Sequence, residues 1–367
     1  MRVDIHTLRP GESLPCDLAE SWRALRADSG PHSASPYFSH RYAEAVAATS
    51  PAPVHIALQR PRWGEPRALL AFQGRGQARP AGAPMSDYNG PLGTPEGGLE
   101  GFLQGAGIGA LQSGGLVGGV ESLDTEPVCR IDLREGHAAW VESRNDSYRR
   151  HIKGLRRRVR RATEEVGEPR ATYRSRSRDD FNLLIAWKRA QFASTAKFDV
   201  LGGWPLKLLQ RLWDRHDEPL RAELHALRLG DRPAAFDLGL TDGEVFHSWI
   251  TAYDPELSNY APGMQLLERL VEAAPDLGYR TVDLGVGLEG YKRHYTNVDA
   301  RVGVGVVHAS GGAHAAAAKL YSGAEARLEP LARLRRRYSQ IAAVEPRWTA
   351  RARALTEAMV GEATGRS

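Results

Sequence analysis

Residues 224–253, with the sequence LHALRLGDRPAAFDLGLTDGEVFHSWITAY, consist of three apolar segments joined by short polar turns. The segments cover 224–230, 234–240 and 244–253, and their lengths are typical of strands. The turn between the last two contains Asp242-Gly243, which is a strong hairpin signal. The stretch therefore predicts an antiparallel meander of three strands.

A corner from strand to helix follows directly after this meander. Pro262 and Gly263 precede a helix predicted over 264–274, and a strand predicted over 279–285 carries Asp283 near its end. The first turn of such a helix presents unpaired backbone N–H groups and the positive end of the helix dipole, which together suit a pyrophosphate. Pro262 has no N–H to contribute, and proline is also common in a first helical turn for structural reasons alone.

The residues on either side of this region predict further helices and strands. Apolar runs indicate strands near 54–58, 67–74, 127–133 and 300–307, and helical spacing indicates helices over 17–29, 37–49, 143–166, 179–193 and 204–215. A Gly- and Pro-rich loop lies between the second and third of these strands, and within it SDYNGPLG (86–93) adds an acid, an aromatic ring and an amide. A loop of that length is typically either functional or a linker.

The length and composition indicate a globular protein of two domains. The chain has 367 residues, of which 42% are hydrophobic and 25% are charged, and domains average about 150 residues. We predict domains over 1–140 and 141–310, followed by an Arg- and Ala-rich helical extension over 311–367. Cys16 and Cys129 are the only cysteines, too few for a disulfide framework or a cysteine-rich zinc site.

The sequence lacks both metal-binding motifs and a recognisable export signal. Neither an HExxH motif nor a His-Cys cluster occurs, so we predict no metal. The N-terminus lacks the apolar run of a secretory signal, and the most apolar window, 302–318, is interrupted by His308 and His314. We expect a cytoplasmic protein, with a peripheral position at the inner face of the membrane left open.

The positive charge is concentrated in one segment. The formal net charge is +5, yet residues 149–161 hold eight basic residues and no acid; the remaining 41 basic residues are outnumbered by 44 acidic ones. Ile152, Leu155 and Val159 form a narrow apolar stripe on the predicted helix, so the basic side chains would face outward. A charge run is most often simply a solvated face. As a binding surface it would suit a CoA 3′-phosphate, a nucleotide sugar, a lipid-linked pyrophosphate, an anionic membrane or tRNA.

The order of motifs along the chain resembles the GNAT acyltransferase superfamily. It is more similar still to the CelD-like acyltransferases of bacterial polysaccharide synthesis, which are distant relatives of the FemABX transferases. The motifs that carry this resemblance are SDYNGPL (86–92), RRRVRRATEEVG (156–167), WKRAQF (187–192), AYDPELSNYAPGMQLL (252–267) and VDLGVGLEGYKRHYTN (282–297).

The resemblance implies an α/β fold of the α+β kind, built from two tandem GNAT-like halves. Each half would hold a mixed, largely antiparallel sheet flanked by helices. It also implies direct transfer of an acyl group from acetyl-CoA or another acyl-CoA to an amine or hydroxyl of a sugar. That sugar would belong to an exopolysaccharide or another cell-envelope precursor. The donor would contact the end of the third meander strand and the corner, at Ala252, Tyr253, Pro262, Gly263 and Met264.

Three residues are candidates for the chemistry of transfer. His247 is the first choice for general base, because imidazole titrates near neutral pH; Asp237 would orient it or serve as the base itself. Regular alternation would place His247, Trp249 and Thr251 on one face of their strand, and Ser248 and Ile250 on the other. The resemblance implies that Lys292 assists the transfer, and an ammonium group suits a developing oxyanion.

Five residues are candidates for contacts with the acceptor: Asp87, Tyr88, Trp249, Asp283 and Tyr291. Structural alternatives stay open for several of the candidates. A strand histidine is often a core residue, Lys292 would equally suit a solvated surface, Asp283 would equally cap the next turn, and Tyr291 with Tyr295 would equally form a packed pair.

Two other functions are compatible with the sequence. One is a FemABX-type transfer from aminoacyl-tRNA to a cell-wall precursor, and tRNA is expected as a partner only in that case. The other is a non-catalytic, membrane-associated scaffold of glycan synthesis. No DNA partner is expected.

Overall fold

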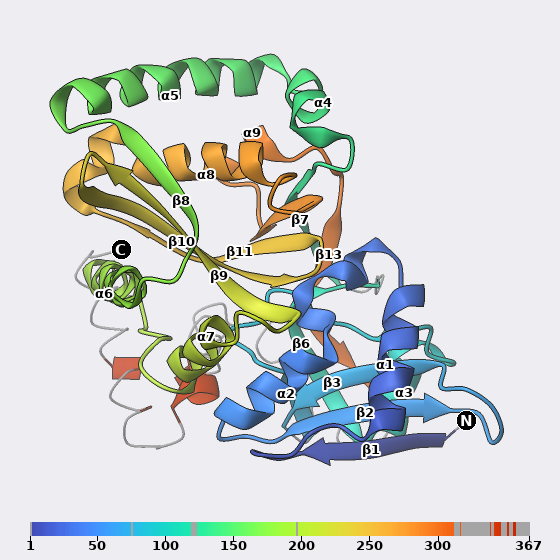
Figure 1. The fold of residues 1–367 in the computed structure, drawn as a ribbon. Coiled ribbons are helices and arrows are strands. Elements are labelled where there is room, and N and C mark those ends of the chain that lie inside the picture. Colours follow the sequence, from blue (N-terminus) through green and yellow to red (C-terminus); the bar gives the residue numbers. More distant parts are fainter. Residues whose placement is uncertain are drawn as a thin grey trace. The chain divides into compact units, whose positions relative to one another are not determined.

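A computed structural model of the chain describes residues 2–74, 76–118, 123–195 and 197–311, together with residues 316, 338, 341–345, 351, 355 and 356. The chain divides into two compact units (Figure 1). Unit 1 comprises Met1–Glu126, Val200–Arg211 and Val302–Ser367, and unit 2 comprises Pro127–Asp199 and Leu212–Arg301. The extension predicted over 311–367 lies mainly outside the described residues.

Unit 1 is built on a mixed sheet. Strands β1 to β4 pair antiparallel in sequence, β5 pairs with β3, β6 runs parallel to β4, and β13 runs antiparallel to β6. The elements are β1 (Arg2–Leu8), α1 (Cys16–Asp28), η1 (Pro31–Ala34), η2 (Pro36–Phe38), α2 (His40–Thr49), β2 (Val54–Arg60), β3 (Ala68–Gln73), β4 (Gly76–Pro80), β5 (Leu92–Gly93), α3 (Gly98–Gly105), β6 (Ile108–Leu116) and β13 (Arg301–His308).

Unit 2 is built on a second mixed sheet. Strands β8 to β11 pair antiparallel in sequence, β12 runs parallel to β11, and β7 runs antiparallel to β12. The elements are β7 (Asp124–Asp132), α4 (Gly136–Glu142), α5 (Asp146–Glu165), β8 (Pro169–Ser175), α6 (Arg178–Ser194), β9 (Leu220–Leu229), β10 (Arg232–Asp242), β11 (Val245–Tyr253), η3 (Pro255–Tyr260), α8 (Pro262–Ala273), β12 (Thr281–Val286) and α9 (Lys292–Tyr295). Helix α7 (Trp204–Asp214) has residues assigned to both units.

The two halves share one order of elements. In the first, a strand, two helices and three antiparallel strands (β1, α1, α2, β2, β3, β4) lead to helix α3 and to β6, which is parallel to β4. In the second, β8, α6, α7, β9, β10 and β11 lead to helix α8 and to β12, which is parallel to β11. The mixed α/β class and the repeated arrangement predicted from the sequence are confirmed.

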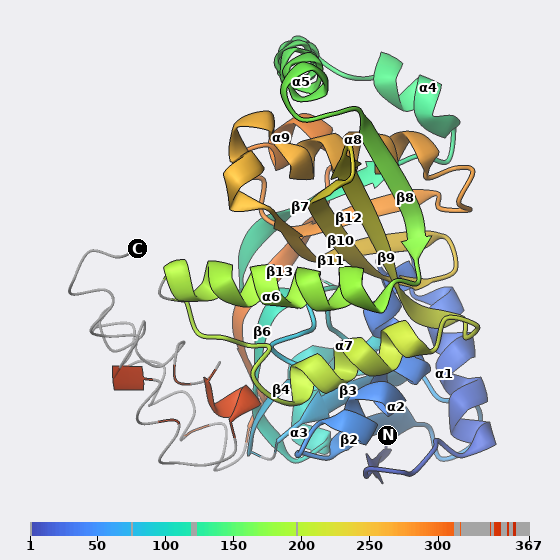
Figure 2. The same ribbon diagram turned by 60° about the vertical axis from the view of Figure 1, so that its left-hand side comes forward.

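Helices cover both faces of the sheet of unit 2. Helix α8 lies on one face and α6 on the other (Figure 2). The buried face of α8 carries Leu266, Leu267, Leu270 and Val271 at helical spacing, so the hydrophobic effect fixes its position on the strands. Helix α5 packs on the outer side of α8 and α9 (Figures 1 and 2).

Strand β11 contains a β-bulge at Trp249. Leu238 of β10 opposes Ile250, whereas the next residue, Gly239, opposes Ser248, so Trp249 has no opposite residue on β10. The two residues of a directly opposed pair point to the same side of a sheet. Ser248 and Thr251 therefore share a face, and the regular alternation predicted for this strand is wrong beyond Ser248.

Gly239 lies under an aromatic ring of the core. A Cβ at this position would be 2.0 Å from Cζ of Phe246. Phe246 is fully buried, and its ring packs against the rings of His225 and Tyr279, so it has little room to move.

We expect Gly239→Ala to lower the free energy of unfolding by about 1–3 kcal/mol, the usual cost of overpacking a core. Urea unfolding followed by circular dichroism measures this effect. Gly154→Ala on α5 is the control, because a Cβ there meets nothing within 4 Å and alanine favours a helix. Equal unfolding midpoints for the two variants would contradict the prediction.

Candidate active site

The two parallel strands at the centre of unit 2 separate after a short ladder. Three residue pairs join β11 to β12, and the last is His247 opposite Asp283. Beyond it, β11 stays paired with β10 as far as Tyr253, while β12 stays paired with β7 as far as Val286. A gap therefore opens between β11 and β12, and the inner edge of β11 along it is free of β12.

A cavity of about 310 Å³ lies at this gap. Its walls come from β10, β11 and β12, from the residues around the start of α8, and from Tyr291. The lining residues are Phe236, Asp237, Ser248, Thr251, Ala252, Tyr253, Ser258, Ala261, Pro262, Gly263, Met264, Leu266, Leu267, Leu284 and Tyr291. The structure thus brings together Asp237, all five residues predicted to contact the donor, and Tyr291.

Asp237 is the titratable acid of this cavity. Its side chain is nearly buried, with 5% exposure, and burial raises its pKa from 3.8 to about 7. Ser248 Oγ lies 3.0 and 2.9 Å from the two carboxylate oxygens and donates to them. This hydrogen bond and the positive charges of His247 and Lys188 lower the pKa, but they do not cancel the effect of burial.

Ser248 was not among the predicted site residues. It reaches Asp237 because Asp237 opposes Thr251 while Gly239 opposes Ser248 across the bulge at Trp249. No residue type in the sequence marks a bulge of this kind, so only the register of the strands reveals the contact.

Tyr291 faces the same cavity from the start of α9. Burial raises the pKa of its hydroxyl to about 12, and the negative charge of Asp237 adds to the shift. At neutral pH the hydroxyl therefore stays protonated and is a proton donor. Its ring packs edge-on against Tyr295, which is fully buried.

His247 and Asp283 lie at the base of the gap and not among the residues that line it. Both are fully buried, and His247 Nδ1 is 3.4 Å from Asp283 Oδ1. Arg130 on β7 places Nε at 3.1 Å and Nη2 at 3.0 Å from Asp283 Oδ2, and the N–H of Gly285 donates to Oδ1. The three side chains form a row across β11, β12 and β7 at the point where the strands part.

Lys292 and Trp249 also lie outside the set of lining residues. Lys292 Nζ donates to the carbonyl of Val286 at 3.1 Å. A different lysine interacts electrostatically with Asp237. It is Lys188 on α6, whose Nζ donates to the carbonyl of Thr251 at 3.2 Å. Burial lowers the pKa of Lys188, and the charge of Asp237 opposes that shift. Lys188 lies in the WKRAQF segment, where the helical pattern alone gave no reason to choose it.

The corner before α8 has a left-handed backbone at Ala261, with φ of 52°. The carbonyl of Ala261 accepts from the N–H groups of Met264 and Gln265. The Gly263 N–H lies in the first turn of α8, where no earlier carbonyl of the helix can accept from it. A Cβ on Gly263 would meet only Cδ1 of Tyr253, at 3.9 Å. This position can therefore accept an alanine without strain.

The corresponding gap in unit 1 is filled by the chain itself. The ladder between β4 and β6 also ends after three residue pairs. Beyond it, Asn89 donates its N–H to Gly115 O (3.0 Å) and accepts from Val117 N–H (2.7 Å), pairing in parallel with Leu116. Leu116 is paired with β13 on its other edge, so Asn89 occupies the edge that faces β4.

The neighbours of Asn89 pack closely in unit 1. A Cβ on Gly115 would be 1.9 Å from the carbonyl oxygen of Asp87, and Tyr88 is 2% exposed, with its ring edge-on to Tyr37. Contact of Asp87 and Tyr88 with an acceptor stays a prediction.

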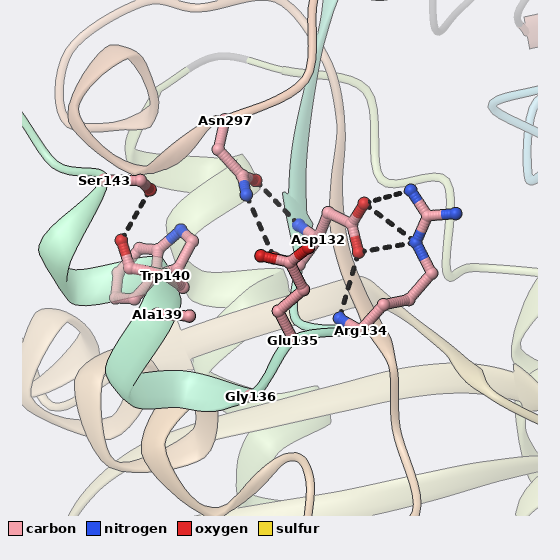
Figure 3. Close-up of a pocket in the computed structure, with 8 residues that line it drawn as sticks. All are labelled: Asp132, Arg134, Glu135, Gly136, Ala139, Trp140, Ser143 and Asn297. Atoms are coloured by element: carbon pink, nitrogen blue, oxygen red, sulfur yellow. Dashed lines mark hydrogen bonds and ion pairs between the residues drawn. The ribbon is translucent and has the colours of Figure 1, made fainter.

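A second cavity in unit 2, of about 470 Å³, lies beside α4 (Figure 3). Its acid, Asp132, is held by Arg134 through Nε at 2.9 Å from both carboxylate oxygens, and this contact keeps the pKa of Asp132 below its usual value. Asn297 bonds to the backbone N–H and carbonyl of Asp132. Asp132 is thus paired with Arg134, and Glu135, the other acid that lines this cavity, is exposed to solvent; neither carboxyl is buried as Asp237 is.

The described ranges hold neither a cluster of metal ligands nor a helix that could span a membrane. No group of three or more His, Cys, Asp and Glu side chains there is arranged to hold a metal ion. Within the same ranges, every helix is too short or too polar to cross a bilayer.

One family model and several solved structures match the chain. Residues 149–293 match the family model described as an acetyltransferase (GNAT) domain. No curated protein matches the chain. Among solved structures, FemX has a TM-score of 0.51 at 11% identity, covering 80% of this chain and 95% of FemX. A conserved protein of unknown function from Bacteroides thetaiotaomicron has a TM-score of 0.50 at 11% identity, covering 79% and 96%.

A third solved structure is the C-terminal DUF2156 domain of a putative lysylphosphatidylglycerol synthetase from Agrobacterium fabrum. Its TM-score is 0.46 at 13% identity, and the match covers 82% of this chain and 95% of the other chain.

The likeness to FemX shows the fold alone, over four fifths of this chain. The domain match spans β8 to β12 and the cavity around Asp237. The chain therefore contains a GNAT acetyltransferase domain, and the protein is an acyltransferase.

Proposed function

We propose that the protein transfers an acyl group from acetyl-CoA or another acyl-CoA to an amine or hydroxyl of a sugar. The sugar would be part of an exopolysaccharide or cell-envelope precursor, as in the CelD-like enzymes. The observation that carries the proposal is Asp237, a carboxyl group with a pKa of about 7 in the gap between β11 and β12. A base with a pKa near the working pH is what general-base catalysis requires.

The donor site is proposed for the gap and the corner. The free inner edge of β11 offers backbone groups to an extended chain that bears amides, such as the pantetheine arm of CoA. In unit 1 the equivalent gap holds such a chain, because Asn89 bonds there to β6 through its own peptide groups. The Gly263 N–H and the first turn of α8 would then face the pyrophosphate.

The acyl group would pass directly from the thioester to the acceptor, through a tetrahedral intermediate and without an acyl-enzyme. Asp237 removes a proton from the acceptor amine or hydroxyl as its lone pair attacks the thioester carbonyl carbon. The C–S bond then breaks, and the hydroxyl of Tyr291 protonates the departing thiolate of CoA. The products are the acylated sugar and free CoA, and Tyr291 regains a proton from Asp237 through solvent. In this scheme Lys188 acts through the charge of Asp237, while a direct role for His247, Asp283 or Lys292 stays a prediction.

An aromatic side chain at the cavity supports a sugar as the acceptor. Tyr291, one of the residues predicted to contact the acceptor, lines the cavity and is 38% exposed. Exposed tyrosine rings present an apolar face with a polar tip, which suits the mixed apolar and hydroxylated surface of a sugar ring. The match to an acetyltransferase (GNAT) domain favours a catalytic role over the alternative of a non-catalytic scaffold.

Titration of the full chain with acetyl-CoA tests the donor. We expect one site per chain by calorimetry, because the gap of unit 1 is filled by residues around Asn89. With amino sugars as acceptors, we expect release of the CoA thiol. Absence of binding across a set of acyl-CoAs would contradict the proposed donor, and transfer from aminoacyl-tRNA without CoA would favour the FemABX-type alternative.

Replacing Asp237 by asparagine removes the base at nearly unchanged volume. We expect kcat to fall by about 10²–10⁴-fold, the usual contribution of a general base. In the wild type, kcat/KM should rise with pH and level off above about 7, as Asp237 ionises. A variant that retains full activity and the same pH profile would rule out Asp237 as the base.

The same substitution should also change the stability of the fold, which can be measured without an assay of activity. The pKa of Asp237 is about 7 in the folded chain, against the model value of 3.8, so the folded state binds the extra proton and loses stability as pH rises from about 4 to 7. Each unit of pKa shift corresponds to about 1.4 kcal/mol. We expect Asp237→Asn to be more stable than the wild type by a few kcal/mol at pH 8 and to match it at pH 4. Urea unfolding at the two pH values measures the difference.

Gly263→Ala tests the corner without disturbing the fold. The added methyl group fits beside Tyr253 but narrows the approach to the Gly263 N–H. We expect the Kd for acetyl-CoA to rise about 3- to 10-fold, the worth of one hydrogen bond, with an unchanged melting temperature. Gly154→Ala on α5 serves as the matched control and should leave the Kd unchanged. Equal affinities for both variants would place the donor away from this corner.

A further inference from the structure

Helix α5 carries a continuous basic face. Eight basic residues lie between 149 and 161, and all are exposed; they are Arg149, Arg150, Lys153, Arg156, Arg157, Arg158, Arg160 and Arg161. No acid interrupts them, because Asp146 precedes this stretch and Glu164 follows it. The stretch spans about 18 Å of helix at 1.5 Å per residue.

The inward side of α5 is apolar and packed. Leu155 is buried, Ile152 and Val159 are half-buried, and the helix contacts α8, α9 and η3. At 100° per residue, Arg157 lies opposite this stripe, and Lys153 and Arg160 lie beside it on the outward half of the helix. Figures 1 and 2 show α5 on the outer side of α8 and α9, and the eight basic side chains are exposed.

Most of these charges have no ion pair. Arg149 pairs with Asp146 at 3.5 Å and Arg161 with Glu165 at 2.8 Å. The other six make no ion pair with any residue in the described ranges. Glu268 attracts one of them, Arg156, but cations so close along one helix repel one another, and an external anion would relieve that repulsion.

The basic face is formed before any partner binds. Asn145 caps the helix by accepting from the N–H of Tyr148, and the apolar stripe fixes its rotation on α8. The array therefore costs little conformational entropy on binding, in contrast to a disordered basic tail.

We propose that α5 binds the anionic lipid headgroups of a membrane surface. The face is the outer side of one straight helix (Figure 1), which suits a flat layer of negative charge. Base stacking, the usual companion of charge in single-stranded nucleic-acid binding, has no platform here, since Tyr148 is buried and His151 stacks on His294. The outward side also lacks apolar side chains, so the helix adsorbs on the headgroups without inserting among the acyl chains.

The distribution of charge orients the protein on such a surface. Outside residues 149–161 the chain has more acidic than basic residues, and an anionic layer repels that remainder. The far end of α5 adjoins the candidate site: Arg161 lies over the ring of Tyr260 at 5.5 Å, and Tyr260 immediately precedes Ala261 at the corner. If the proposed function holds, the acceptor would then be a lipid-linked sugar presented at the membrane.

Flotation of the full chain with vesicles tests the proposal independently of acyl transfer. We expect binding to vesicles that contain phosphatidylglycerol and none to vesicles of phosphatidylcholine alone. Binding should be strong at 0.1 M salt, where the Debye length is about 10 Å, and be lost at 1 M, where it is about 3 Å. The triple variant Lys153→Gln, Arg157→Gln, Arg160→Gln should partition about a hundredfold more weakly, from about 1 kcal/mol per charge.

The control changes the same net charge elsewhere. Arg23→Gln, Arg62→Gln, Arg215→Gln removes three exposed arginines outside α5 and should bind vesicles like the wild type. Circular dichroism checks that both triple variants are folded. Equal loss of binding in the two variants, or no binding at 0.1 M salt, overturns the proposal. Displacement of the protein from vesicles by an equal phosphate concentration of RNA overturns it in favour of nucleic acid.

Discussion

The contact between Arg130 and Asp283 determines the architecture of the candidate site. It lies at the last rung before β11 and β12 separate, and His247 extends it to the third strand. Asp283 is fully buried and Arg130 nearly so, and a buried charge is tolerated only when it is paired. Loss of either partner would leave the other uncompensated, so the row joins β7, β12 and β11 at the last rung of the β11–β12 ladder.

The gap begins directly beyond this row, where the backbone pairing of β11 with β12 stops. Beyond it, β11 and β12 each retain one partner strand and diverge. The resulting hollow is lined by the end of β11 and the start of α8, and Asp237 is buried in its wall. The raised pKa of Asp237 is the direct result of that burial. The same geometry that makes Asp237 basic also makes its ionised form costly to the fold.

Much of the fold of unit 2 was predictable because its signals are local. The strands over 224–253, the corner at Pro262-Gly263 and helix α8 follow from apolar runs, a hairpin signal and a helix start. These elements in this order bring Asp237, Tyr253, Gly263 and Tyr291 to one cavity. Strand β8, with the sequence PRATYRS, was not predicted because its residues are mostly polar, and α3 and β6 were not predicted because they are rich in glycine.

The roles of individual side chains were harder to predict because they depend on depth and register. His247 has the chemistry of a base, yet it is buried at the base of the gap beside Asp283. The alternation of residues along a strand does not show how deeply a side chain is buried. Lys188 comes to Asp237 from a helix on another face of the sheet. Such contacts arise from tertiary packing between segments about 50 residues apart.

The bulge at Trp249 also affects how the chain is compared with relatives. One extra residue in β11 turns Thr251 and Ser248 to the side of Asp237. A homologue with an unbulged strand would be one residue shorter here and would place its equivalent of Thr251 at a different count from the hairpin. An alignment of such sequences by residue identity would pair the wrong positions unless its gap is placed at Trp249. The boundary between correctly and incorrectly matched site residues thus lies within a single strand.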